Sequence, residues 1–278
     1  MKNDWVIETL QNVLNTWNDK MTTIMELATQ SPAEFKGGEI WASMLRIENA
    51  LQAIGFSLLV LFFAAGVVKT CGSFVELKKP EHFLKLFVRF ILAKAAITYA
   101  PEFLLMIFAI TQGITGTIIS TAGYGSSNKM VLPDSIVSAI SNVGFMNGIG
   151  LSAISILCSV VVFALSVMML LTVYKRFFKI FIYTSFAPIP LAGFAGEPTQ
   201  NIGRSFVKKY AAAGLEGCVM VLVCIIFSSY VTSAPIVDES LSASAMVWGY
   251  MGELIINMLV VVSAMKLSEK VVTDMTGL

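Results

Sequence analysis

The stretch that decides the fold is residues 174–217, YKRFFKIFIYTSFAPIPLAGFAGEPTQNIGRSFVKKYAAAGLEG. Its apolar run, 177–196, is about 20 residues long, which is sufficient to span a bilayer. The run is flanked by basic residues at both ends, and such flanks favour the cytoplasmic side. Pro188 and Pro190 remove two backbone donors and oppose a continuous helix. The sequence therefore predicts a helix–break–helix segment that enters the membrane and returns, shielded by neighbouring protein. Its basic flanks are Lys175, Arg176 and Lys179, and Arg204, Lys208 and Lys209.

The composition of the whole chain places it in a membrane. It is 56% hydrophobic and 13% charged, whereas soluble proteins are roughly 25% charged. No basic start followed by a short apolar core and a cleavage site is visible, so no signal peptide is expected. Cys158, Cys218 and Cys224 lie in apolar runs without metal-site spacing, which predicts buried free thiols. We therefore predict a polytopic all-α bundle.

Residues 1–48 form the first predicted domain, a helix over 4–29 and a linker. An apolar seam repeats along this helix at 3-4 spacing, which is typical of helix packing. Ser31 and Pro32 end the helix, and the excess of acidic over basic residues suits the outer side of the membrane. The seam either packs on the protein's own domain or the membrane surface, or it forms a contact between subunits. Its residues are Ile7, Leu10, Leu14, Trp17, Met21 and Ile24.

The second predicted domain, 49–278, contains the membrane spans. The loop 120–147 has little charge and many Gly, Ser and Pro residues, which predicts irregular outer backbone. The run 83–119 holds one crossing with an interfacial helix, or two tight crossings. A seven-crossing alternative would place the Lys175 cluster outside, which the positive-inside bias disfavours. We predict five crossings plus the re-entrant segment, with the N-terminus outside and the C-terminus inside. The other spans are 50–68, 149–174, 210–231 and 243–265.

Several polar side chains fall at membrane depth, where a charge costs about 2.5–3.5 kcal/mol and usually faces protein or water. Small residues lie beside them at helical spacing, which allows close helix approach. The polar groups either hydrogen-bond one another to hold the bundle or line a wet path or a partner groove. The polar residues are Lys94, Glu216, Glu253 and Asn257; the small ones are Ala213, Gly217, Ala245, Gly249 and Gly252.

Catalytic patterns are missing from the sequence. The one histidine, His82, lies in a predicted cytoplasmic loop, and no HExxH, phosphate-loop or GxSxG motif occurs. No aspartate falls inside a predicted span, which excludes a paired-aspartate protease. We expect no enzyme activity, metal or cofactor.

The order of these features resembles the TrbL-like polytopic subunit of conjugative type IV secretion systems, especially the Gram-positive mobile-element type. The resemblance rests on FSLLVLFF (56–63), FLKLFVRFILAKA (83–95), YKRFFKIFIYTSFAPIPLAGFAGEP (174–198), TQNIGRSFVKKYAA (199–212) and LEGCVMVLVCIIFS (215–228). It implies an integral cell-membrane component of a DNA-transfer channel. The partners it implies are the bilayer, other secretion subunits including ATPases, further copies of the chain, and transient contact with transferred DNA or protein.

A second function class stays open beside this one. A broken helix near buried Glu216 and Glu253 is also the pattern of an ion-coupled small-solute transporter. Only one half of the chain carries a Pro-x-Pro break, so no inverted repeat is visible. A second broken segment in the structure would favour the transporter.

Overall fold

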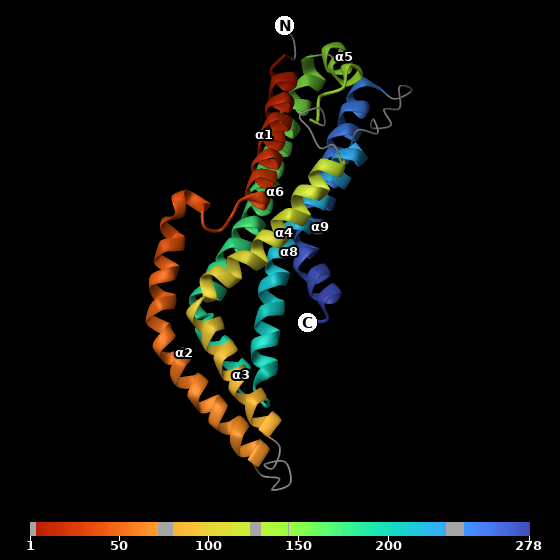
Figure 1. Cartoon of the computed structure of the whole chain (residues 1–278). Helices are drawn as coiled ribbons and strands as arrows, with labels where there is room; N and C mark the ends of the chain where they lie inside the picture. Colours follow the sequence, from red (N-terminus) through yellow and green to blue (C-terminus); the bar gives the residue numbers. More distant parts are fainter. Residues whose placement is uncertain (1–3, 72–79, 123–128, 144, 232–241) are drawn as a thin grey trace. The chain divides into compact units, whose positions relative to one another are not determined.

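The computed structural model describes residues 4–71, 80–122, 129–143, 145–231 and 242–278 (Figure 1). Every regular element in these residues is a helix, which confirms the predicted all-α class. The helices are α1 (Asp4–Thr29), η1 (Phe35–Gly38), α2 (Glu39–Cys71), α3 (Pro80–Thr98), α4 (Ala100–Ala122), α5 (Asp134–Asn142), α6 (Phe145–Phe186), α7 (Pro188–Leu191), η3 (Ala192–Ala195), α8 (Gln200–Val231) and α9 (Ala243–Thr276).

Five helical segments in the described residues are long and apolar enough to cross a membrane. This confirms the predicted number of spans. The run 83–119 divides into α3 and α4, and of these two helices α4 alone qualifies as a candidate span. The candidate spans are Phe35–Lys69, Ala100–Ala122, Gly150–Phe186, Gln200–Tyr230 and Ala243–Thr276.

Large apolar side chains on these helices are exposed on the protein surface. On α2 they include Val60, Leu61 and Val68, and on α6 Leu157 and Phe163. Soluble proteins rarely expose apolar surface of this extent, whereas a lipid-facing surface needs it. The chain is therefore a multi-pass membrane protein.

The described chain divides into two compact units, each with its own packing. Unit 1 comprises Met1–Thr29, Thr115–Tyr174 and Cys218–Ser268, and unit 2 comprises Gln30–Ile114, Lys175–Gly217 and Glu269–Leu278. Helices α4, α6, α8 and α9 each contribute residues to both units.

In unit 1, α1 spans the residues predicted from the sequence and ends at Thr29. Its Asn18 side chain makes two hydrogen bonds with the backbone of Met130: Nδ2 donates to the carbonyl oxygen at 2.9 Å, and Oδ1 accepts from the amide at 3.0 Å. Trp17 packs edge-on against Phe227 of α8, with ring centroids 6.0 Å apart. These contacts attach α1 to its own unit.

Within the loop 120–147, the expectation of irregular backbone is wrong for Asp134–Asn142, which forms α5. Pro133 precedes the helix in an extended conformation, where its missing N–H costs nothing at a helix start. Ile136, Ala139 and Ile140 are buried. These three side chains lie on one helical face, and their burial stabilises α5 although turn-forming residues surround it.

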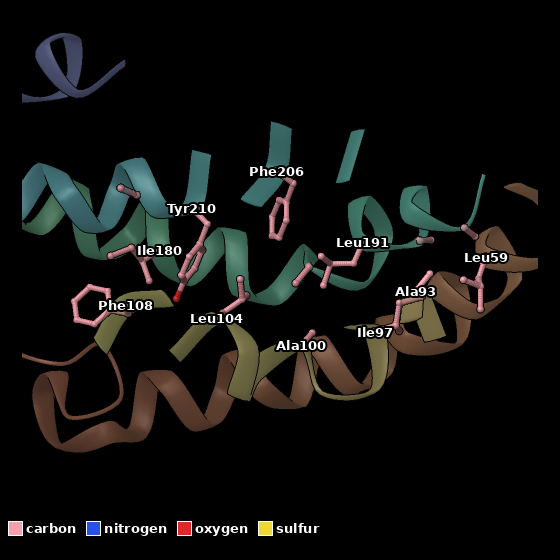
Figure 2. Close-up of a cluster of buried hydrophobic side chains, with 14 residues drawn as sticks. Leu59, Ala93, Ile97, Ala100, Leu104, Phe108, Ile180, Leu191, Phe206 and Tyr210 are labelled. Carbon is pink, nitrogen blue, oxygen red and sulfur yellow. The ribbon is translucent and has the colours of Figure 1, made fainter. Parts of the chain in front are cut away.

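In unit 2, α2, α3, α7 and η3 pack around one apolar core, which Figure 2 shows. Leu59 of α2, Ala93 and Ile97 of α3, and Leu191 of α7 are among its buried side chains. Two glycines let α2 approach the segment that follows α6. A Cβ on Gly55 would lie 2.8 Å from Cβ of Pro188, and one on Gly66 would lie 3.3 Å from Cα of Gly196.

Candidate functional site: a charge network in unit 2

The basic turn of α6 contains Lys175, Arg176 and Lys179. Lys175 and Lys179 are four positions apart and lie on the same side of the helix, whereas Arg176 is buried. The sequence indicated these residues as a marker of the cytoplasmic side. In the structure they also contact α8 and the end of α9, so they take part in packing as well.

Arg176 is almost fully buried, with 2% of its surface exposed. Its Nε donates to the carbonyl oxygen of Ala213 at 3.0 Å, and its Nη2 donates to that of Gly214 at 3.2 Å. The guanidinium carbon also lies 5.3 Å from the centre of the Phe108 ring and 5.8 Å from that of Phe177. Backbone oxygens and aromatic faces both attract a guanidinium group. Together they hold a positive charge inside the bundle.

Gly217 makes room for this guanidinium group. A Cβ at Gly217 would lie 2.5 Å from Cζ of Arg176 and 2.6 Å from Nη1. Ala213 and Gly217 were singled out in the sequence as small residues for close helix approach. In the structure the space beside Gly217 receives the side chain of Arg176.

Four side chains form an ion-pair chain across three helices. Lys175 of α6 pairs with Glu269 of α9 at 2.7 Å, and Glu269 pairs with Lys179 of α6 at 2.9 Å. Lys179 in turn pairs with Glu216 of α8 at 2.6 Å. The side-chain exposure falls along this chain from 70% at Lys175 through 42% at Glu269 and 23% at Lys179 to 6% at Glu216.

The two ends of this chain differ in energetic weight. An exposed ion pair such as Lys175–Glu269 contributes about 0–1 kcal/mol and is screened by salt. The Lys179–Glu216 pair is largely withdrawn from water, and removing one partner of such a pair leaves the other uncompensated. Breaking the inner pair between α6 and α8 would therefore leave a buried charge, whereas breaking the outer pair between α9 and α6 costs little.

Sequence reasoning found one of the four members, Glu216, and missed its partners. Lys179 lies 37 positions from Glu216 and 90 positions from Glu269, so no local spacing connects them. Glu269 lies beyond the predicted last span, where a charged residue is ordinary. Lys266, three positions before Glu269, and Lys270, directly after it, gave no signal for a long-range ion pair.

The other predicted polar residues lie outside this network. Lys94 on α3 and Glu253 on α9 are exposed, and Asn257 is half-buried. On the same helix, Ala245 is half-buried, and a Cβ added at Gly249 or Gly252 would meet no atom within 4 Å. Within the described residues of one copy, the small-residue face of α9 is therefore uncovered at Gly249 and Gly252.

The proline-broken segment is a bend followed by a tight turn. Helix α6 is interrupted at Ala187, and Pro188 and Pro190 lie in α7, whose flanking residues keep right-handed helical dihedral angles. The chain then folds back at 196–199, where the Thr199 hydroxyl donates to the carbonyl oxygen of Gly193 at 2.9 Å. The interruption thus lies directly before Pro188, the first half of the predicted segment continues α6 to Phe186, and the turn comes a few residues later.

The predicted seam of α1 lies on the buried face of the helix. Ile7 is half-buried, and the remaining five positions of the seam are buried. They are Leu10, Leu14, Trp17, Met21 and Ile24. Asn18, which anchors α1 to Met130, has no periodicity that singles it out in the sequence.

The described ranges contain no cluster of side chains suited to bind a metal ion. They contain no group of three or more His, Cys, Asp or Glu side chains able to hold an ion. The side chain of His82 lies outside the described residues. Cys158, Cys218 and Cys224 are buried thiols that form no disulfide, as predicted.

The long apolar helices, the bend at the prolines and the internal charge network define a polytopic helical membrane protein. Residues 17–188 match the model of the family described as TrbL/VirB6 plasmid conjugal transfer like protein. This match covers more than half of the chain, and the protein belongs to that family. It is thus a membrane component of conjugal transfer. Neither the search of curated proteins nor the search of solved structures finds a match.

Proposed function

We propose that the protein is a non-enzymatic channel or scaffold subunit of a conjugative type IV secretion apparatus. The observation that carries the proposal is the family match over 17–188, which includes the first three candidate spans and reaches Pro188. The sequence has no phosphate loop, so partner ATPases would supply the energy. Transferred DNA or protein would contact the subunit transiently as it passes.

Assembly with further copies or other secretion subunits would cover the exposed face of α9. A Cβ at Gly249 or Gly252 would meet no atom within 4 Å, and Glu253 and Ile256, which follow them on α9, are exposed. A carboxylate facing lipid is costly, whereas small residues beside it allow a neighbouring helix to approach. The face thus suits a helix from another subunit.

The orientation that we propose has the N-terminus outside and the C-terminus inside, with 1–48 as the outer domain. The exposed face of α1 carries Asp4, Glu8, Asp19 and Glu26. Basic residues instead gather near the end of α2, the start of α8 and the end of α9. Such clusters favour the cytoplasmic side. They are Lys69, then Arg204, Lys208 and Lys209, then Lys270.

The transporter remains the second candidate because a second interruption does occur, between α3 and α4 near Pro101. The helical hydrogen bonds continue through it: the Tyr99 amide donates to Ala95 at 2.9 Å, and the Phe103 amide donates to Tyr99 at 3.0 Å. Transporter sites use unwound backbone whose carbonyls coordinate the ion. A bend with its hydrogen bonds intact favours the secretion subunit.

Substitution of Glu253 separates the two functions. Glu253→Gln keeps size and hydrogen bonding but removes the charge, and Glu253→Leu removes both. For an assembly role, we expect Gln to retain most conjugal transfer and Leu to lose assembled complex. Mating frequency is measured beside the yield of membrane complex. If Gln abolishes transfer while the complex forms normally, proton or ion coupling at Glu253 replaces the assembly role.

A further inference from the structure

The end of α9 belongs to unit 2, whereas the body of the helix belongs to unit 1. Within this end segment, Glu269–Leu278, Val272 is buried and the other side chains are half-buried or exposed. Val272 is therefore the one fully buried side chain of the segment.

Glu269 supplies the polar attachment of the segment. Its Oε1 pairs with Lys179 and its Oε2 with Lys175, both on the basic turn of α6. The other charged groups nearby are Glu216, which faces Lys179 from α8, and Lys270 beside Glu269 on α9. With 42% of its side chain exposed, Glu269 forms pairs that dissolved ions screen.

Loss of Glu269 would leave the inner pair intact. Lys179 also pairs with Glu216 at 2.6 Å, so we expect α6 and α8 to stay joined when the outer pairs open. The network can consequently come apart at α9 without leaving a buried charge unpaired.

We propose that Glu269–Leu278 is a detachable strap. In the closed state Glu269 pairs with Lys175 and Lys179 on the basic turn of α6. In the open state both of these pairs are broken, while Lys179 keeps its pair with Glu216. The strap opens when the outer ion pairs are screened or lost, and the fold of unit 2 persists.

Amide hydrogen exchange on the purified full chain tests the strap. Exchange of helical amides reports local opening, so Glu269→Gln should speed exchange across the segment by about two- to fivefold per lost pair at low salt. Peptides from α6 and α8 should exchange as in the unsubstituted protein. Asp274→Asn, at an exposed acid of the same segment outside the network, is the matched control and should change nothing.

A salt titration of the unsubstituted protein gives a second measurement that needs no variant. Between about 0.05 and about 1 M NaCl, screening should speed exchange in the segment and leave α8 unchanged. The strap is refuted if salt and Glu269→Gln both leave the segment's exchange unaltered. It is equally refuted if α6 and α8 lose protection to the same degree, because Glu269 would then support the core.

Discussion

Gly217 is the residue at which sequence and structure connect most directly. Its missing side chain leaves the space that the Arg176 guanidinium fills, with a would-be Cβ 2.5 Å from Cζ. Gly249, by contrast, faces open space within one copy. Two glycines of the same sequence class therefore have different roles, one inside the fold and one on its surface.

Gly217→Ala should consequently destabilise the protein by about 1–3 kcal/mol, the usual cost of overpacking. Gly249→Ala is the matched control, and it should be neutral or stabilising by up to about 1 kcal/mol because alanine favours helix over glycine. Unfolding of both variants in the same detergent measures the difference. Equal stabilities would mean that Arg176 is not held against Gly217.

At the residue level, the sequence located Glu216 and the small pair Ala213 and Gly217, but it could not supply their partners. Lys179 and Arg176 were predicted to mark the cytoplasmic side of the membrane. In the structure both side chains also contact α8. Which carboxylate or carbonyl a lysine or arginine meets depends on the register between helices far apart in the sequence. Composition and periodicity carry no information on that register.

Among the elements, the proline-broken segment decides the topology. The sequence predicted the interruption because Pro188 and Pro190 lack donors, and α6 is interrupted at Ala187. The place of the fold-back was not predictable, because it depends on the contact between Thr199 and Gly193. Helix α5 was missed for a similar reason: burial of Ile136 and Ile140 outweighs its turn-rich surroundings.

Cysteine labelling tests whether the proline-broken segment returns to the side of the membrane from which it enters. Single cysteines replace Lys175, before the bend, and Glu197, in the exposed turn after it. Because both flanks are basic, both cysteines should react with an impermeant reagent only after the cells are opened. A cysteine in place of Glu8 on α1 should react from outside and serves as the control. Labelling of positions 175 and 197 from opposite sides would show that the segment crosses.

At the scale of the whole molecule, the uncovered face of α9 is the candidate surface for assembly with other subunits. A Cβ at Gly249 would meet no atom of its own copy within 4 Å. A single copy of Gly249→Leu should therefore fold normally, yet a neighbouring helix could no longer approach closely. Val260→Leu, at an exposed apolar position of α9, is the control. We expect a larger loss of assembled complex for Gly249→Leu at equal membrane levels. Equal yields of complex would remove Gly249 from any helix contact.

The central claim is that this membrane protein is a required part of a conjugal transfer apparatus, and the family match over residues 17–188 is its main support. The most direct measurement is the mating frequency of a donor strain that carries a clean deletion of the gene, with and without the intact gene supplied in trans. We predict loss of transfer in the deletion strain and recovery with the intact gene. Normal mating in the deletion strain would contradict the claim.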